Sequence, residues 1–428
     1  TQFDDHHAAR LFGLFGWNAK VSKDLADFKR RIRARKEQLR ALAKTHDKLI
    51  VHISGVPPWL SAWEGEGTFE GGGWEDKQAH PPKDVETWKQ MIRELALVFR
   101  EVEGVERYYE FWNEPDLKYW QGSLEDFLAL YEATVTTIRE TDPEGKVGGP
   151  AVNQWNGRIH KKTGSDVLVH ELIRFAARRE LPLDFVSWHH FGRPVAAIAE
   201  AQASYAAELA KHGFDPDATE YLVTEWSAPG RGMPYGNAFF AETMLGLFRA
   251  RVDAQTAACW EEFHAKPDPK GFPPWGLMTQ QGDRHGTWYV HRFFDRLARD
   301  SRGVAVVRPD DETVVVVSRK DDAVFDLLVW RTGVHPPLEA ALRVLEEADV
   351  DRDRLRWFGT VDRLERALRA RAPVPPGWAE AFEAACDAYA AAGPAPERLV
   401  LELAGASDVT VEFAESVRTE HGLSLIHI

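Results

Sequence analysis

The fold of this 428-residue chain is decided by residues 108–117, which read Tyr-Tyr-Glu-Phe-Trp-Asn-Glu-Pro-Asp-Leu. The aromatic residues that open this stretch are typical of a buried β-strand. Pro115 ends the strand, because proline has no N–H to donate to a sheet ladder. The stretch therefore predicts that Glu114 lies at the carboxyl end of a strand.

A second stretch, residues 221–226, reads Tyr-Leu-Val-Thr-Glu-Trp and is an apolar strand that also ends on a carboxylate, Glu225. In a barrel of parallel strands the carboxyl ends meet on one face, and that face carries the active site. Two carboxylic acids on opposite sides of a glycosidic bond are what most glycosidases use to cleave it. Glu114 and Glu225 together therefore predict a barrel glycosidase.

Strands and helices alternate over the first 300 residues, which indicates an α/β fold with a parallel sheet closed into a (β/α)8 TIM barrel. We expect seven strands where a complete barrel has eight, so we expect the first strand to be missing from this chain. The expected strands are 10–17, 49–54, 108–114, 146–151, 183–191, 221–226 and 256–263. The expected helices are 24–44, 88–99, 123–138, 167–180, 195–211, 239–251 and 286–299.

From about residue 304 onward, short β-rich runs replace this alternation. They predict a small C-terminal β-sandwich with helical stretches near 364–371 and 378–392. We expect a catalytic barrel over 1–300, a β-sandwich accessory domain over 301–416 and a tail over 417–428 that is not native sequence. The β-rich runs are 304–307, 313–318, 323–330, 399–403 and 409–413.

Composition limits the partners. The net charge of −14 argues against nucleic acid, which requires a basic face. The basic segment 29–36 has apolar residues at helical spacing around it and reads as the solvated side of an amphipathic helix. No segment approaches the length of a membrane span, so we expect no membrane partner. The 16 Trp are compatible either with sugar stacking or with a large core.

The two cysteines, Cys259 and Cys386, are expected to be free thiols, which favours the cytoplasm. A secreted protein is the alternative, because the chain does not begin with Met and a leader can precede it. Oligomeric state is open, with a homo-oligomer as one option.

Hydrolysis with retention needs one carboxylic acid to protonate the leaving oxygen and one carboxylate about 5–5.5 Å away to attack the anomeric carbon. We assign Glu114 as the acid and then the base, because neighbouring aromatic residues such as Trp112 favour its neutral form by desolvation. Glu225 is the expected nucleophile. Arg10 is its candidate cationic neighbour, although Arg10 could equally pair with Glu110.

Further side chains are expected to bind the sugar. Asn113 can hydrogen-bond a 2-hydroxyl, His189 ends another strand, and Trp260 could form a stacking floor. Glu261 and Glu262 add acceptors for hydroxyl groups. His189 and His190 are adjacent and point to opposite sides of a strand. No Cys, His and Asp spacing completes a metal site, and we expect neither a metal nor a cofactor.

At these residues the chain resembles glycoside hydrolase family 39 of clan A, the β-xylosidase and α-L-iduronidase group. The resemblance implies a (β/α) barrel with a C-terminal β-sandwich, Glu114 as acid/base, Glu225 as nucleophile and His189 as a sugar-binding residue. It is carried by the strings at 81–84, 110–117, 146–151, 184–187, 224–225 and 276–277, and by His189.

The sequence also departs from the family. The family's Arg-Phe-His-Gly reads Arg-Leu-Phe-Gly at 10–13, so that Phe12 replaces a pocket histidine. The family's Arg-His-Ala-Tyr reads Trp-His-His-Phe at 188–191, and its Trp-Thr-Phe reads Trp-Glu-Glu at 260–262. These positions surround the sugar, so the departures concern the substrate and not the reaction type.

A β-xylosidase-like activity on oligosaccharides or polysaccharides is the first expectation, because the nearest strings are those of the xylosidases. An α-L-iduronidase-like or other glycosidase of the clan is the alternative. An iduronidase must bind a sugar carboxylate, for which Arg231 is a candidate cation. The remaining alternatives are a carbohydrate-binding barrel without catalysis and a truncated, inactive barrel with two open sheet edges.

Overall fold

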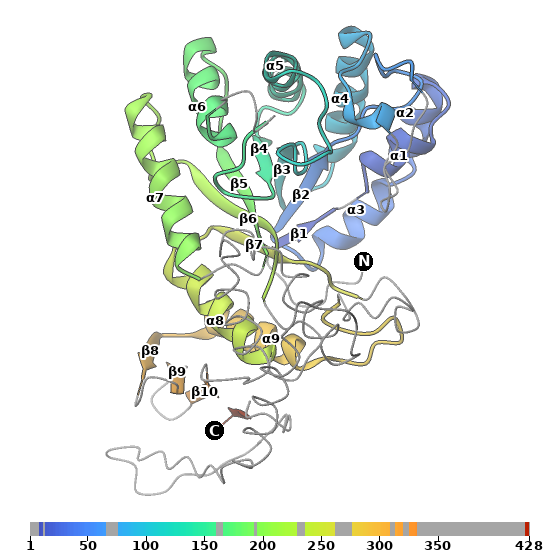
Figure 1. The fold of residues 1–428 in the computed structure, drawn as a ribbon. Coiled ribbons are helices and arrows are strands. Elements are labelled where there is room, and N and C mark those ends of the chain that lie inside the picture. The colour runs from blue at the N-terminus through green and yellow to red at the C-terminus, as the bar shows by residue number, and fades with distance from the viewer. Residues whose placement is uncertain are drawn as a thin grey trace, which may run out of the picture.

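The computed structural model describes residues 8–11, 13–65, 76–159, 166–191, 195–228, 236–261, 276–308, 313–319, 325–331 and 424–427. Within these residues, seven parallel strands run in the order β1 to β7, and β7 curls round to approach β1. Helices α4 to α7 surround the strands on the outside (Figure 1). The predicted barrel is confirmed, and its strands are Ala8–Arg10 (β1), Lys48–Ile53 (β2), Glu106–Phe111 (β3), Lys146–Val152 (β4), Phe185–Phe191 (β5), Glu220–Ser227 (β6) and Ala254–Ala257 (β7).

Helices α2, α4 and α5 begin at side chains that cap them. The carboxylates of Asp24 and Asp84 accept a backbone N–H at the starts of α2 and α4, and Ser123 forms a capping box with Asp126 at the start of α5. The helices are Gly16–Val21 (α1), Leu25–Arg33 (α2), Lys36–Ala43 (α3), Val85–Phe99 (α4), Leu124–Thr141 (α5), Leu168–Arg179 (α6), Ala196–Lys211 (α7), Gly236–Arg249 (α8) and Gly286–Asp300 (α9), with a 3-10 turn at Asp76–Ala79.

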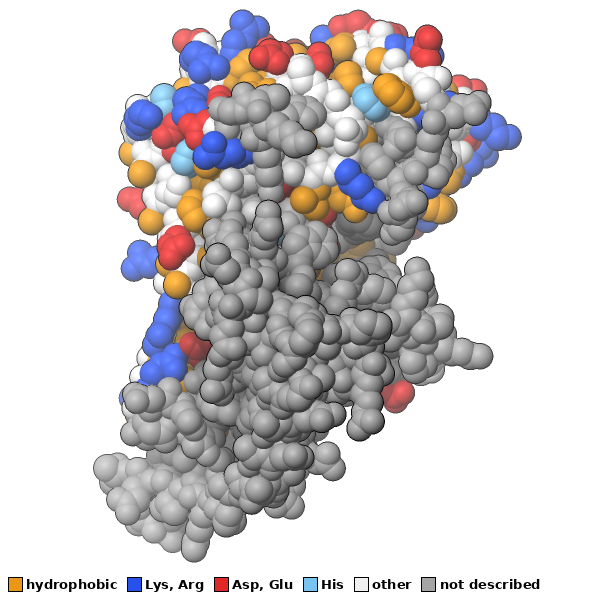
Figure 2. Space-filling view, in the orientation of Figure 1, with side chains coloured by type: hydrophobic (Ala, Val, Ile, Leu, Met, Phe, Trp, Pro, Cys, Tyr) orange, Lys and Arg blue, Asp and Glu red, His pale blue; other side chains and the backbone are white. Residues whose placement is uncertain are grey.

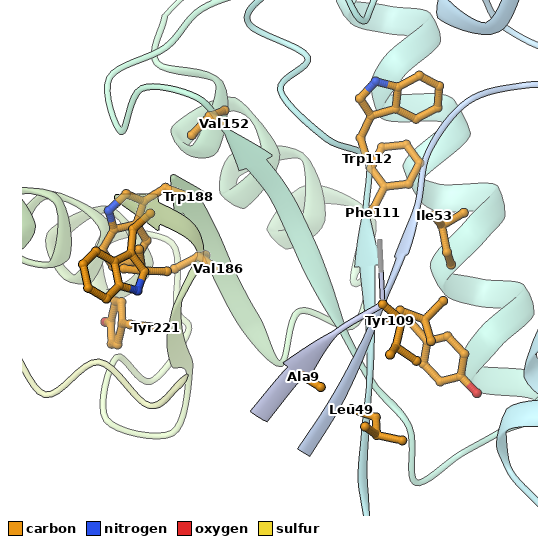
Figure 3. Packing of buried hydrophobic residues seen from close by; sticks show 14 of the residues in the cluster. Ala9, Leu49, Ile53, Tyr109, Phe111, Trp112, Val152, Val186, Trp188 and Tyr221 are labelled. Atoms are coloured by element: carbon orange, nitrogen blue, oxygen red, sulfur yellow. The ribbon is translucent and has the colours of Figure 1, made fainter. Parts of the chain in front are cut away.

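The outward side of the strands packs against the helices. Along β3, the residues Tyr109 and Phe111 point outward (Figure 3). The Tyr109 ring lies 5.3 Å from that of Phe99 on α4, and the Phe111 ring lies 5.0 Å from that of Phe127 on α5. Because side chains alternate along a strand, the residues at the alternate positions, Tyr108 and Glu110, point into the barrel.

The barrel interior is built in layers along the strands. At the amino ends, charged side chains from three strands form a network in which the Lys146 ammonium contacts the carboxylates of Glu106 and Glu220. The next layer is a small apolar cluster that includes Ile50, Tyr108, Phe185, Leu222 and Ala254. Two residues further along β1, β2 and β3, period-two alternation brings Arg10, His52 and Glu110 into a buried polar layer.

Several predicted boundaries are wrong. Residues 10–17 are not a strand, because β1 ends at Arg10 and the chain turns at Gly13, whose φ of +86° glycine accepts without strain. The turn serves the core, since the Phe15 ring packs 5.4 Å from those of Phe28 and Trp88. The single helix predicted over 24–44 is two helices, α2 and α3, and the last barrel strand covers 254–257 rather than 256–263.

Beyond the barrel, the described residues form one antiparallel sheet of four strands in the order β11, β10, β9, β8. The tail contributes β11, and whether the tail is native sequence stays a prediction. The second sheet of the predicted sandwich, and the runs 399–403 and 409–413, lie outside the described residues, so the domain boundaries stay a prediction. The four strands are Gly303–Val307 (β8), Thr313–Arg319 (β9), Phe325–Arg331 (β10) and Ser424–His427 (β11).

The small sheet is joined to the barrel by helix α8. The Glu242 carboxylate accepts a hydrogen bond of 2.7 Å from Arg308 and one of 3.1 Å from the Trp330 indole. Over the barrel helices on the face drawn in Figure 2, Lys and Arg side chains are interspersed with Asp and Glu.

Candidate active site

The strands bring most of the predicted site residues to the carboxyl end of the barrel. Arg10 is the last residue of β1, rather than the start of a strand as predicted, and Asn113 and Glu114 follow β3. His189 and Glu225 lie on β5 and β6, and the ladder pairs them directly with each other. The register of this strand pair shifts between Trp188 and His189, an irregularity of the kind that re-aims side chains near active sites.

Arg10 is the hub of the site. Its guanidinium donates to Oε2 of Glu110 at 2.7 Å, to Oδ1 of Asn113 at 2.7 Å and to Oε2 of Glu225 at 3.2 Å. The side chain is buried, as is that of Glu110. The two pairings that the sequence left open for Arg10, with Glu110 and with Glu225, therefore both occur, each through a different nitrogen of the rigid guanidinium fork.

Glu114 is held by an unusual backbone. Trp112 and Glu114 both adopt positive φ, 71° and 48°, which non-glycine residues rarely do. The N–H of Glu114 donates to the carbonyl of Ala151 at 2.8 Å. Strained backbone of this kind concentrates at functional sites, where the surrounding structure holds it in place, so this geometry directs the Glu114 side chain into the site.

The Gly148–Gly149 pair of β4 lets this strand lie very close to its two neighbours, β5 and the end of β3. A Cβ on Gly148 would lie 2.0 Å from the carbonyl oxygen of Phe185, and one on Gly149 would lie 2.5 Å from that of Phe111. Glycine is therefore required at both positions if β4 is to sit between its neighbours. The strand then delivers Asn153 to the site, where its Nδ2 donates to Oε1 of Glu114 at 2.7 Å.

The two glutamates converge on His189. Its Nδ1 lies 3.1 Å from Oε1 of Glu114 and 3.7 Å from Oε2 of Glu225. These two oxygens can thus be no further apart than the sum of the two distances. This upper limit on the distance between the two carboxylates is compatible with the separation of about 5–5.5 Å typical of retaining glycosidases. It reaches only the lower edge of the range of about 6.5–9.5 Å found in inverting ones.

Burial raises the pKa of both glutamates above the usual carboxyl value. The charges of His189 and Arg10 act in the opposite direction on the pKa of Glu225, while the charge of Glu114 raises it further. For Glu114, the hydrogen bond from the Asn153 amide is the largest effect that acts against burial. Because both pKa values are raised, the direction of the shift does not tell which glutamate is the acid and which the nucleophile. The direct contact with the Arg10 guanidinium favours Glu225 as the nucleophile, because it stabilises the ionised form that a nucleophile needs.

Other predicted residues are placed less fully. Trp260 follows β7 with its indole buried, and its carbonyl accepts the N–H of Leu277 at 2.8 Å. Its role as a stacking floor stays a prediction. Glu262, Phe12 and Arg231 lie outside the described residues, so their predicted roles are likewise untested.

The sequence reasoning missed Asn153, Asp116 and Tyr119. Asp116 is buried beside the site, where burial raises the pKa of its carboxyl to about 7. Tyr119 lies close enough to both glutamates for their charges to raise its pKa, after burial. A signal for Asn153 existed, since a polar residue directly after a buried strand of this barrel points to the carboxyl face.

The described residues contain no group of three or more His, Cys, Asp or Glu side chains arranged to hold a metal ion. None of the helices in these ranges combines the length and hydropathy that crossing a bilayer requires.

Solved structures with the same fold include known glycosidases. A β-xylosidase from Caulobacter crescentus CB15 superposes with a TM-score of 0.56 and 20% identity, covering 77% of this chain and 68% of that one. A glucosidase from Croceicoccus marinus gives a TM-score of 0.55 and 18% identity, covering 75% and 67%. The class of fold is thus the barrel of the glycosidases.

Sequence comparison finds similarity to one family of glycosidases over part of the chain. Residues 66–216 match the model of glycosyl hydrolases family 39. A β-xylosidase of Caldicellulosiruptor saccharolyticus is 32% identical over 242 residues, which are 51% of this chain and 47% of that protein. A β-xylosidase of Geobacillus stearothermophilus is 34% identical over 117 residues, or 26% and 21% of the two chains. The chain spans about half the length of the first relative and less of the second, and over residues 66–216 it is similar to glycosyl hydrolases family 39.

Proposed function

We propose that this protein hydrolyses β-xylosides with retention of anomeric configuration, using Glu225 as nucleophile and Glu114 as acid and base. The observation that carries the proposal is the convergence of both carboxylates on Nδ1 of His189, at 3.1 Å and 3.7 Å. The family and its two β-xylosidase relatives support the choice of reaction and sugar.

In the first step, a Glu225 oxygen forms a bond to the anomeric carbon while the bond from that carbon to the leaving oxygen breaks. Glu114 transfers its proton to the leaving oxygen, which departs as an alcohol. In the second step, the ionised Glu114 takes a proton from water, and the water oxygen displaces Glu225 from the sugar. Two inversions give net retention, and Glu114 ends protonated as it began.

The described side chains favour a neutral sugar over a uronic acid. An iduronide carboxylate would need a cation, and Arg10 already serves Glu110, Asn113 and Glu225. A second negative charge near the two glutamates would raise their pKa values further. Within the described part of the site, a xyloside therefore meets no such repulsion, and an iduronidase-like activity is the less favoured alternative.

The proposal is tested with nucleophile and acid variants. Glu225→Ala is expected to lose hydrolysis, and azide is expected to restore it with a product of inverted configuration. Glu114→Ala should spare dinitrophenyl xyloside, which needs no proton on its leaving group, far more than a xyloside with an alkyl leaving group. Wild-type rates for either variant on the alkyl xyloside would refute the assigned roles.

A panel of aryl glycosides tests the sugar. Xyloside, glucoside, galactoside, arabinoside and iduronide are compared by kcat/KM, with the product anomer followed by NMR. Xyloside is expected to lead, and a β-anomer should form first. Hydrolysis confined to the iduronide would overturn the substrate, while binding of xylose without turnover of any glycoside would indicate a carbohydrate-binding barrel.

A further inference from the structure

The loops that follow β3 and β4 are fastened to each other beside Glu114. The buried Asp116 carboxylate accepts two backbone N–H groups from the second loop, that of Asn153 at 2.8 Å and that of Gln154 at 3.1 Å. Together with the bond from the Glu114 N–H to the carbonyl of Ala151, near the end of β4, three hydrogen bonds tie the loop after β3 to β4 and to the loop that follows β4. The backbone of Asn153 is therefore fixed relative to Glu114.

The Asn153 side chain uses that position to contact the acid. It is buried, and its Nδ2 donates to Oε1 of Glu114 at 2.7 Å. The Nδ1 of His189 lies 3.1 Å from the same oxygen. An amide N–H can only donate, so Oε1 is an acceptor in this arrangement whatever the protonation state of the carboxyl group.

We propose that Asn153 is a positioning residue that reserves Oε1 of Glu114 as acceptor and leaves Oε2 to carry the catalytic proton, and that Asp116 holds Asn153 in place. The inference rests on the proposed glycosidase function and extends it. The transferred proton then always starts from the same oxygen, which matters because misplacement by about 1 Å can cost about a hundredfold in rate.

Asn153 also tunes the acid. Burial raises the pKa of Glu114, and the Asn153 amide acts against it by stabilising the ionised form. The other charged or titratable groups that act on this carboxyl group come from neighbouring strands and from its own loop. They are Arg10 on β1, His189 on β5, Glu225 on β6, and Asp116 and Tyr119 on the loop after β3.

The test compares Asn153→Ala with wild type by the pH dependence of kcat/KM on an alkyl xyloside. Loss of a hydrogen bond to the carboxylate should move the alkaline limb, which reports the proton on Glu114, upward by about one pH unit. The rate at the optimum should fall about tenfold or more. On dinitrophenyl xyloside, kcat/KM should stay within about twofold, because that leaving group needs no acid.

Three further variants keep the test decisive. Asn153→Asp keeps the shape but puts a carboxylate beside Glu114, so it should move the alkaline limb further up than Asn153→Ala does. Asn156→Ala makes the same change three residues along the loop, at a half-buried side chain that is not among the described partners of Glu114, and should match wild type. Asp116→Asn turns one acceptor into a donor facing an N–H and so loosens Asn153, which should lower the rate on the alkyl xyloside. Because it also removes a negative charge near Glu114, its alkaline limb should move up less than that of Asn153→Ala.

Thermal unfolding shows whether each variant is folded. If Asn153→Ala does not fold, the limb of Asn153→Asp decides. An unshifted alkaline limb in a folded Asn153 variant, or equal losses on the alkyl and dinitrophenyl xylosides, would overturn the inference and indicate a merely structural role. Failure of the proposed function would look different, because wild-type protein would then hydrolyse none of the xylosides.

Discussion

Replacing Arg10 with Met would test whether one buried guanidinium both stabilises the barrel and keeps the nucleophile ionised. The side chain is 4% exposed and that of Glu110 is fully buried. Removing one partner of such a pair leaves an uncompensated charge in the interior and typically costs about 3–5 kcal/mol. Methionine has a similar length and adds no charge, so the expected loss in the free energy of unfolding falls in that range.

The same substitution acts on catalysis through Glu225. The guanidinium lies 3.2 Å from Oε2 of this residue and lowers its pKa against the effects of burial and of Glu114. An opposite charge at such a distance typically shifts a carboxyl pKa by about 1–3 units. In Arg10→Met the acidic limb of kcat/KM should therefore move to higher pH by about that amount, with an approximately tenfold loss per unit at pH values below the limb.

Two companion variants separate the effects. Arg10→Met combined with Glu110→Gln removes the stranded charge, so it should recover much of the stability while the acidic limb stays displaced. Arg10→Lys keeps the charge but lacks the fork that reaches three acceptors. Its acidic limb should therefore lie near that of wild type, while its free energy of unfolding should stay well below the wild-type value. Urea unfolding and pH profiles with dinitrophenyl xyloside measure both quantities. An Arg10→Met variant with the wild-type acidic limb would refute the assignment of Arg10 to Glu225.

Two other predictions concern stability. Burial raises the folded-state pKa of Glu114, so the fold favours the protonated carboxyl group, and the stability that this group contributes is lost as pH rises through that pKa. Glu114→Gln should therefore be more stable than wild type at pH 7. The gain should vanish below about pH 4, where Glu114 is protonated in both the folded and the unfolded protein. Lys146→Met removes a partly exposed cation from Glu106 and Glu220, and should cost about 1 kcal/mol in urea unfolding, less at high salt, with kcat unchanged.

Much of the barrel could be predicted because each strand and helix carries its own local pattern. The predictions failed where a local pattern has two structural solutions. The segment 11–15 suits a strand in sequence, yet the chain turns at Gly13 and leaves the sheet, and Phe15 packs against α2 and α4. The helical spacing over 24–44 does not reveal the break at Ala34 and Arg35, because residues on both sides of it continue the same buried face.

The candidate site divides in the same way. Glu114 and Glu225 were predictable because a strand end identifies a carboxyl face without knowledge of the neighbouring strands. Asn113 followed from the same reasoning, whereas Arg10 was placed at the start of a predicted strand and not at the end of β1. Asn153 carried a strand-end signal, but its bond to Glu114 and the contacts of Asp116 could not be predicted, because they arise from two loops approaching each other, and that approach depends on the lateral packing of β3 and β4. Such contacts between loops have no periodicity in the sequence.

The layers inside the barrel explain why the site can hold so many opposed charges. Along β3, Glu106, Tyr108 and Glu110 point inward in turn, so one strand contributes to the ion network, the apolar layer and the polar layer. The apolar layer separates the charged network at the amino ends from the site, and the low dielectric around the site strengthens each interaction within it. Arg10 then binds acceptors on β3, just after β3 and on β6, and the hydrogen-bonded sheet sets the spacing between these strands. Glu225 is thus held by β6 and Arg10, and Glu114 by Asn153 and by its backbone bond to Ala151, before any sugar binds. This is the preorganisation that the proposed double displacement requires.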